Sequence, residues 1–335
     1  MHGLAGTFFV ALQYATGAGW SVAFRRIPEA MAAALPFGAA GIFAVLLLHP
    51  AVYPWVHGLE HATAFKQFWL SLPFFLGRAA AYVAIWIAFT CSIVRTSRRQ
   101  DRSGELLYTH RNVKLSFVFL VLFSITFSLA SFDWIMSLEP AWYSTIFGVY
   151  NFAGLFSGGL AALILLVLWM RSAGPLRDFV NEEHLHDLGK LLFAFCTFWM
   201  YIWFSQYMLI WYANITEETV YFVRRTNGPW ETLFLLNMLL NWAIPFAVLL
   251  PRGTKRKPGV LVKVAIVVLA GRCLDLYLMI APPFEGAKPA LGIWEAGLLA
   301  GTAGVFTLIF AHALRQLPPV PLEDPCLIES VHYHN

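Results

Sequence analysis

The sequence has few charged residues. Asp, Glu, Lys and Arg make up 13% of its 335 residues, whereas 59% are hydrophobic and the mean hydropathy is +0.64. A soluble globular domain carries about 25% charged residues. The composition therefore excludes a soluble protein and indicates one that is largely embedded in a membrane.

The residues that hold metals and redox cofactors are also sparse. The four cysteines are scattered and form no C-x-x-C pair, so the motifs of an iron–sulfur cluster or an attached haem are missing. Of the ten histidines only His312 lies well within an apolar run, which does not provide the two ligands of a b-type haem. Phosphate-binding loops, nucleophile elbows and zinc motifs are absent. We expect no redox centre or metal bound by this chain.

Long apolar runs are abundant. A hydrocarbon layer about 30 Å thick requires about 20 helical residues, and runs such as "LSFVFLVLFSITFSLASF" are continuous rather than alternating, as in helices and not barrel strands. We predict an all-α polytopic membrane protein, a single integral membrane domain of about nine helices with a cytoplasmic tail at 314–335. The predicted spans are 4–24, 30–49, 68–94, 113–134, 144–170, 188–212, 232–250, 260–280 and 293–313.

The basic residues predict the orientation. Alternate connections between the spans hold 17 of the 23 Lys and Arg residues, the opposite connections hold four, and Arg78 and Arg272 lie inside spans. Because basic connections stay on the cytoplasmic side, we predict a bacterial inner-membrane protein with a periplasmic N-terminus and a cytoplasmic C-terminus. The net charge of +4 then reflects this orientation and not affinity for nucleic acid.

Charged residues within or beside the spans are the first candidates for function, because a charge at membrane depth costs several kcal/mol unless it is paired or hydrated. Arg272 and Asp275 are three residues apart and can meet on one helical face, as a structural ion pair or as a proton or quinone site. Arg78 has no acid within a turn, so it snorkels or takes a partner from elsewhere, such as Asp133, Glu139 or a lipid head group. Asp133 and Glu139 flank a predicted outer turn that has no Lys or Arg.

Other polar residues extend this set. Ser144, Gly148, Asn151 and Gly158 share one face of a span, which indicates either close helix packing or a hydrated groove. The run "NEEHLHDLGK" is either a solvated helix start or a cluster that collects protons. The candidate residues of a proton pathway are Asp133, Glu139, Arg272, Asp275, His184, His186, Asn151 and Arg78, and no quinone site can be assigned.

Four stretches together resemble a known family. "FDWIMSLEPAWYSTIFGVYNFAG", "WFSQYMLIWYANITEETVYFVRR", "GRCLDLYLMIAPPF" and "DPCLIESVHYHN" are similar to the ActF-type, NrfD-like (polysulfide-reductase-like) membrane subunits of bacterial alternative complex III. The resemblance implies two four-helix bundles plus a peripheral pair of helices, ten in all. The nine predicted spans depart from that pattern by one helix at the N-terminus.

The resemblance also implies a function. Such complexes are respiratory or photosynthetic, oxidise menaquinol, and pass electrons to a periplasmic carrier or an oxidase. The implied partners are a second NrfD-like subunit, an iron–sulfur/molybdopterin-like subunit, multihaem and monohaem cytochromes c, small membrane subunits and lipids, but no nucleic acid. The iron–sulfur clusters and haem c would lie in those partners, and this chain would provide a scaffold, contacts to menaquinone or lipid, and a proton pathway. The alternatives are a purely structural scaffold and a free-standing secondary transporter.

Overall fold

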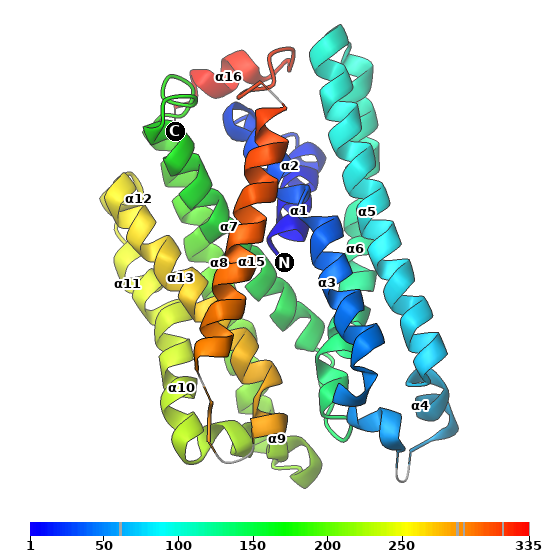
Figure 1. Cartoon of the computed structure of the whole chain (residues 1–335). Helices are drawn as coiled ribbons and strands as arrows, with labels where there is room; N and C mark the ends of the chain where they lie inside the picture. The colour runs from blue at the N-terminus through cyan, green and yellow to red at the C-terminus, as the bar shows by residue number, and fades with distance from the viewer. Residues whose placement is uncertain (60–61, 286–287, 291, 317, 335) are drawn as a thin grey trace.

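The computed structural model describes the chain except residues 60–61, 286–287, 291, 317 and 335, and the described residues form helices and no strand (Figure 1). The α-helices are α1 (His2–Thr16), α2 (Arg26–Ala32), α3 (Leu35–Leu48), α4 (Ala64–Trp69), α5 (Leu72–Ser103), α6 (Leu106–Trp134), α7 (Phe147–Ser172), α8 (Glu182–Ala213), α9 (Thr216–Thr226), α10 (Pro229–Met238), α11 (Ile244–Leu249), α12 (Arg252–Lys255), α13 (Pro258–Ile280), α14 (Pro282–Glu285), α15 (Ile293–Arg315) and α16 (Leu327–Val331). A π-helical segment, Leu239–Ala243, joins α10 to α11.

Eight helical segments of the described chain are long and apolar enough to cross a membrane. They correspond in order to the second to ninth predicted spans, and this confirms an all-helical protein of the polytopic membrane class. Their bounds are Arg26–Leu48, Leu72–Ser103, Leu106–Leu138, Phe147–Ser172, Glu182–Ala213, Pro229–Leu249, Pro258–Phe284 and Ile293–Arg315.

The first predicted span, 4–24, is wrong as a continuous span. α1 has 15 residues, which gives a length of roughly 22 Å, too short for the hydrocarbon layer. It ends at Gly17, whose φ of 63° is the left-handed conformation that glycine adopts most readily. The chain then turns through a short 3-10 segment, Val22–Phe24, into α2. The N-terminus lies midway along the bundle in Figure 1, whereas the prediction of a periplasmic N-terminus had depended on a complete first span.

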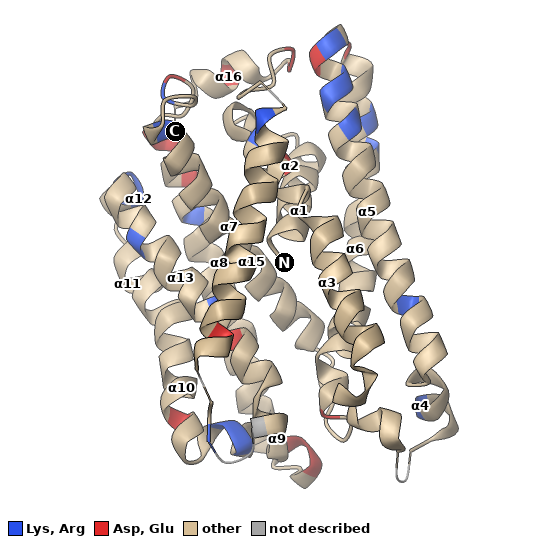
Figure 2. Cartoon of the chain, in the orientation of Figure 1, with Lys and Arg blue, Asp and Glu red and all other residues tan. Residues whose placement is uncertain are grey.

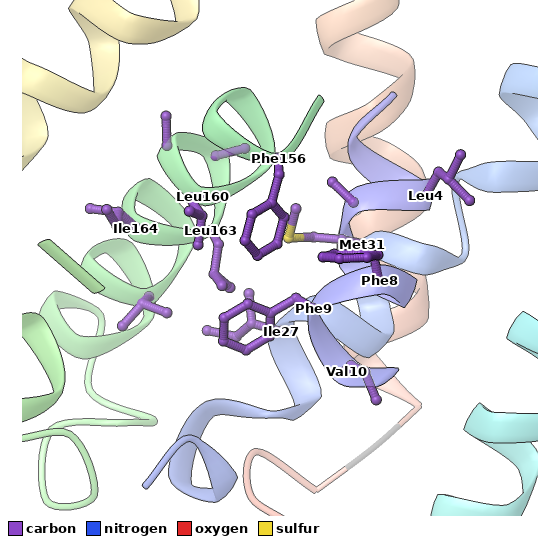
Figure 3. Close-up of a cluster of buried hydrophobic side chains, with 14 of the residues drawn as sticks. Leu4, Phe8, Phe9, Val10, Ile27, Met31, Phe156, Leu160, Leu163 and Ile164 are labelled. Carbon is purple, nitrogen blue, oxygen red and sulfur yellow. The ribbon is translucent and has the colours of Figure 1, made fainter. Parts of the chain in front are cut away.

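α1 is nevertheless part of the core. Phe8 and Phe9 of α1 are buried, and the Phe8 ring lies 4.9 Å from the ring of Phe156 on α7 (Figure 3). The two helices approach closely because Gly159 has no side chain: a Cβ there would lie 2.3 Å from the Cβ of Ala5. The short helix is thus held by close packing against α7.

α7 occupies the centre of the molecule. It packs against α8 and α13 on one side and against α1 and α6 on the other, and α10 and α11 complete the group around α8 and α13. The most apolar 18-residue stretch of α7 is 78% buried, whereas that of α15 is 11% buried. α15 packs against α2 and lies at the front of the bundle in Figure 1. The two four-helix bundles implied by the resemblance remain a prediction.

The charges divide between the two ends of the bundle. In Figure 2 many Lys and Arg residues lie at the end that carries α16 and the last turns of α5, while α9 and α10 contribute both signs at the opposite end. For brevity these are called the α16 end and the α9 end. If basic connections are cytoplasmic, the α16 end is the cytoplasmic one.

Candidate functional site

Asp275 of α13 is the centre of a buried polar cluster, the Asp275 cluster. Its side chain is 1% exposed and forms an ion pair with Arg272, which confirms the pairing expected from their spacing. The carboxylate also accepts hydrogen bonds from the hydroxyl of Tyr150, from Asn237 Nδ2 at 2.8 Å and from Trp199 Nε1 at 3.3 Å. Helices α7, α8, α10 and α13 therefore each contribute a side chain to this one carboxylate.

Glycines of α7 make room for the Arg272 guanidinium. A Cβ at Gly154 would lie 2.2 Å from Arg272 Cζ, and a Cβ at Gly158 would lie 3.2 Å from Arg272 Cγ. Arg272 Nη2 is buried and has no hydrogen-bond partner among the described residues. At the start of α7, a Cβ at Gly148 would lie 2.8 Å from Ser128 Oγ of α6. Of the small residues predicted on this span, Gly148 thus serves close packing and Gly158 lies at the Arg272 site, where Gly154, which was not predicted, makes the closest approach.

We expect Gly154→Ala to disrupt this site far more than Gly158→Ala. The first methyl group would overlap the guanidinium, so Arg272 would have to leave Asp275, whereas the second would require a shift of only a few tenths of an ångström. The thermal midpoint of the detergent-solubilised protein measures the difference. Equal midpoints for the two variants would mean that Arg272 does not occupy this position.

The π-helical segment shapes the side of the cluster formed by α10 and α11. Pro245 lacks the amide hydrogen that would bond to the carbonyl of Asn241 in an α-helix, which accounts for the local change of helix type. Asn241 Nδ2 donates to Asn237 Oδ1 at 2.7 Å, and Asn237 donates in turn to Asp275. The two asparagines therefore form a chain of hydrogen bonds that ends at the carboxylate of Asp275.

A narrow cavity adjoins the Asp275 cluster. Its volume is about 20 Å³, which is room for a water molecule and far too little for a quinone ring. Asp275, Tyr150 and Asn237 line it from within the bundle, and Tyr221 and Arg225 line it from α9. The cavity therefore links the buried carboxylate to a helix at the α9 end of the bundle.

Glu139 lies beyond Arg225 at the same end. Arg225 Nη2 is 2.7 Å and Arg224 Nη1 is 3.0 Å from the Glu139 carboxylate, whose side chain is 12% exposed. Arg225 also donates from Nε to the carbonyl of Leu278 at 2.8 Å and lies over the ring of Tyr221. Burial raises the pKa of Tyr221 to about 12, so its hydroxyl stays protonated.

Asp133 belongs to a separate cluster and not to the one that contains Glu139. Arg78 donates to both of its oxygens, from Nε at 3.0 Å and from Nη2 at 2.8 Å. Tyr82 donates at 3.0 Å and Trp69 Nε1 at 2.9 Å, so each carboxylate oxygen accepts two hydrogen bonds. The partner of Arg78, which the sequence left open, is therefore Asp133, and the site is fully satisfied.

His184 and His186 lie at the α16 end, away from the cavity. Asn181 caps α8: its Oδ1 accepts from the amide of His184 at 3.2 Å, and its own amide donates to His184 Nδ1 at 3.1 Å. The run is thus a helix start whose outer residues Glu182 and Lys190 are exposed, whereas the side chains of both histidines are buried. The structure does not bring these histidines to Asp275 or Glu139.

The C-terminal segment covers this helix start. Tyr333 donates from its hydroxyl to Asp187 at 2.8 Å and accepts from Asn181 Nδ2 at its carbonyl at 2.8 Å. Ser330 donates to the carbonyl of Trp20 at 2.6 Å. Burial raises the pKa of Tyr333 to about 12. Ser330 and Tyr333 of the predicted tail therefore contact the turn after α1 and the start of α8.

Asn151, another predicted residue, is buried one turn before Gly154. Its Nδ2 donates to the carbonyl of Phe147 at 3.0 Å, and its Oδ1 has no partner among the described residues. It lies on α7 with Tyr150, but none of its hydrogen bonds joins it to a charged side chain of the described chain.

A third buried charge cluster was not predicted. Arg26 and Glu29 of α2 are fully buried, with Arg26 Nη1 2.5 Å from Glu29 Oε2, and Arg26 also pairs with Asp101 of α5. Ser97 donates to Glu29 Oε1 at 2.6 Å. Arg26 lies in a predicted connection between two spans, although its spacing from Glu29 in "FRRIPEAM" is that of a helical ion pair.

Comparison with known proteins does not add to this picture. No protein-family model matches the chain, and no curated protein is found to be similar to it. Among the described residues, no three His, Cys, Asp or Glu side chains are grouped as a metal site would require. The resemblance therefore depends on the four quoted stretches, and the site depends on its geometry.

Proposed function

We propose that the chain is a membrane subunit of a quinol-oxidising complex of the alternative complex III type, and that it moves protons between Asp275 and Glu139. The resemblance of the four sequence stretches supports the first part. The observation that carries the second is the cavity of about 20 Å³ that joins Asp275 to Arg225, which is paired with Glu139.

The chemistry of the Asp275 cluster suits a group that gains and loses a proton. Its carboxylate pairs with Arg272 and accepts hydrogen bonds from Tyr150, Asn237 and Trp199. Protonation requires one of these donors to turn away. The adjoining cavity has room for a water molecule, with which the carboxyl group could exchange a proton.

Glu139 forms the other end of the proposed path. Its side chain is 12% exposed and pairs with Arg224 and with Arg225, which lines the cavity. On this proposal the α9 end is periplasmic, so protons leave from Glu139 into the periplasm. The C-terminus is then cytoplasmic, and the membrane is a bacterial inner membrane.

Electron transfer belongs to other subunits on this proposal. Iron–sulfur clusters and haem c would lie in the iron–sulfur/molybdopterin-like and cytochrome c subunits, beside the second NrfD-like subunit and small membrane subunits. This chain would contact lipid and menaquinone at its apolar surface, because the Asp275 cavity is too small for a quinone. It would not catalyse quinol oxidation alone.

A purely structural scaffold is the second candidate, and the Asp133 cluster favours it. That carboxylate is fully satisfied by Arg78, Tyr82 and Trp69 and does not line the cavity, as expected of a pair that only holds helices together. A free-standing transporter is a weaker candidate. Purification from native membranes tests it, because a transporter would come without multihaem and iron–sulfur partners.

Glu139→Gln in the assembled complex tests the proton path. We expect quinol-driven proton release to fall several-fold, because Gln has nearly the same shape and keeps one acceptor for the arginines but cannot carry a proton. Proton release from proteoliposomes, followed with a pH-sensitive dye and divided by quinol oxidised, is the measurement.

Glu217→Gln is the matched control for this test. Glu217 is an exposed acid on α9, the helix that also carries Arg225, and it does not line the cavity. Its variant should leave the ratio of protons to quinol unchanged. If Glu139→Gln behaves in the same way as the control, Glu139 is not on a proton path.

A further inference from the structure

One face of α5 carries a row of arginines at the α16 end. Arg95, Arg98, Arg99 and Arg102 are spaced i, i+3, i+4 and i+7, so they lie along one side of the helix. Arg95, Arg99 and Arg102 are exposed and Arg98 is half-buried. None of them forms an ion pair with any described residue, and Arg98 Nε is buried without a partner. These are the blue turns at the upper end of α5 in Figure 2.

This arrangement is unfavourable without a partner. Like charges at i, i+3 and i, i+4 repel one another on a helix surface. Two cations at the same end do have carboxylate partners: Arg25 lies 2.6 Å from Asp324, and Arg256 lies 2.6 Å from Glu183, whereas the four arginines on this one helix face have none among the described residues. The arginine row therefore points to an acidic group that is not part of this chain.

The same side of α5 continues through the membrane as a surface of small residues. At 100° per residue, Gly77, Ala81, Ala84 and Ala88 lie within about 40° of the line through Arg95, and all four are exposed. A Cβ at Gly77 would meet nothing within 4 Å. This small-residue face allows another helix to approach closely, which is how transmembrane helices associate.

The neighbouring helix shows a different kind of outer surface. The exposed residues of α6 include Phe117, Val121 and Ile125, which are 54%, 62% and 56% exposed. Large apolar side chains of this kind suit contact with lipid tails. The change from large residues on α6 to glycine and alanine on α5 separates a surface for lipid from a surface for a helix.

We propose that a transmembrane helix of a different subunit docks on α5, along Gly77 to Ala88, with Asp or Glu residues at its inner end that bind the arginine row. Arginine is suited to this role because its guanidinium binds a carboxylate through two parallel hydrogen bonds. A second copy of this chain does not fit. A two-fold contact through the same face would set one arginine row against the other.

The inference rests on the proposed membership of a multi-subunit complex and is independent of the proton path. A photoreactive amino acid placed at Ala84, and a second one at Val121 of α6 as control, test it in native membranes. We expect the Ala84 probe to form one main cross-link, to another subunit, at a helix followed by acidic residues. The Val121 probe should label lipid.

Charge reversal provides a second measurement. Arg95→Glu, Arg99→Glu and Arg102→Glu combined should lower the amount of that subunit in the purified complex by roughly tenfold. Arg111→Glu with Lys114→Glu, two exposed cations of α6, should not lower it. The second set is the control for folding. Both sets reverse charges at the same end of one helical hairpin, so a general folding defect would appear in both variants.

Each result has a definite meaning. Cross-links from Ala84 only to lipid or to a second copy, or retention of every subunit after charge reversal of the arginine row, would overturn the inference while leaving the proton path untouched. A chain that purifies without any partner would overturn the membership and this inference together. If Glu139→Gln leaves proton release unchanged, the proton path is wrong but the docking inference is not affected.

Discussion

Replacement of Asp275 by Asn should lower both the stability of the protein and its proton release. Asn keeps the shape of the side chain but leaves Arg272, whose side chain is 6% exposed, without a counter-charge. Breaking a buried ion pair in this way costs about 3–5 kcal/mol. The same change removes the group that would carry the proton. Unfolding of the solubilised protein and proton release per quinol in the assembled complex are the two measurements.

The double variant Arg272→Met with Asp275→Asn separates the two effects. Removal of both charges takes away the unpaired guanidinium, so most of the lost stability should return. Proton release should not return, because no carboxyl group remains beside the cavity. If the double variant releases protons as the parent does, Asp275 has a structural role only and the proposed path is wrong.

The sequence predicted what depends on local spacing. Arg272 and Asp275 are three residues apart on one helix, so their contact follows from helix geometry. The second to ninth spans follow equally from the length of continuous apolar runs. The start of α8 at Glu182 could also be read from the acids and asparagine that precede the apolar run.

What the sequence could not predict depends on neighbours far along the chain. The pairing of Arg78 with Asp133 joins α5 to α6, and the pairing of Glu139 with Arg225 joins the turn before α7 to α9. No spacing rule connects such positions. Asp133 and Glu139 are six residues apart, and the sequence predicted them as one outer site. It could not show that they belong to different clusters.

Two errors have local causes. Hydropathy averaged over 4–24 hid the break at Gly17, because the small apolar residues around it keep the average high. The prediction of a loop at the basic pair between two apolar runs also missed the burial of Arg26, because α2 begins there and Glu29 lies one turn further on. A search for opposite charges three or four residues apart would have found this pair.

Replacement of Asp133 by Asn should be as destabilising as that of Asp275 but should not change proton release per assembled complex. Arg78 would lose its counter-charge and one of its two hydrogen bonds to this side chain, and it is 9% exposed, so a cost of about 3–5 kcal/mol is again expected. The yield of assembled complex should fall accordingly. Proton release and quinol turnover, divided by the amount of complex, should equal those of the parent.

Tyr82→Phe is the milder companion of this variant. It removes one hydrogen bond of 3.0 Å to Asp133 and leaves the ion pair in place, at a cost of about 1.5–3 kcal/mol for a bond to a charged group. Asp133 and Asp275 each accept four hydrogen bonds, two on each oxygen, and they differ in that Asp275 lines the cavity and Asp133 does not. A change in proton release with either variant would mean that a carboxylate away from the cavity also exchanges protons, and cavity access would then not distinguish the two sites.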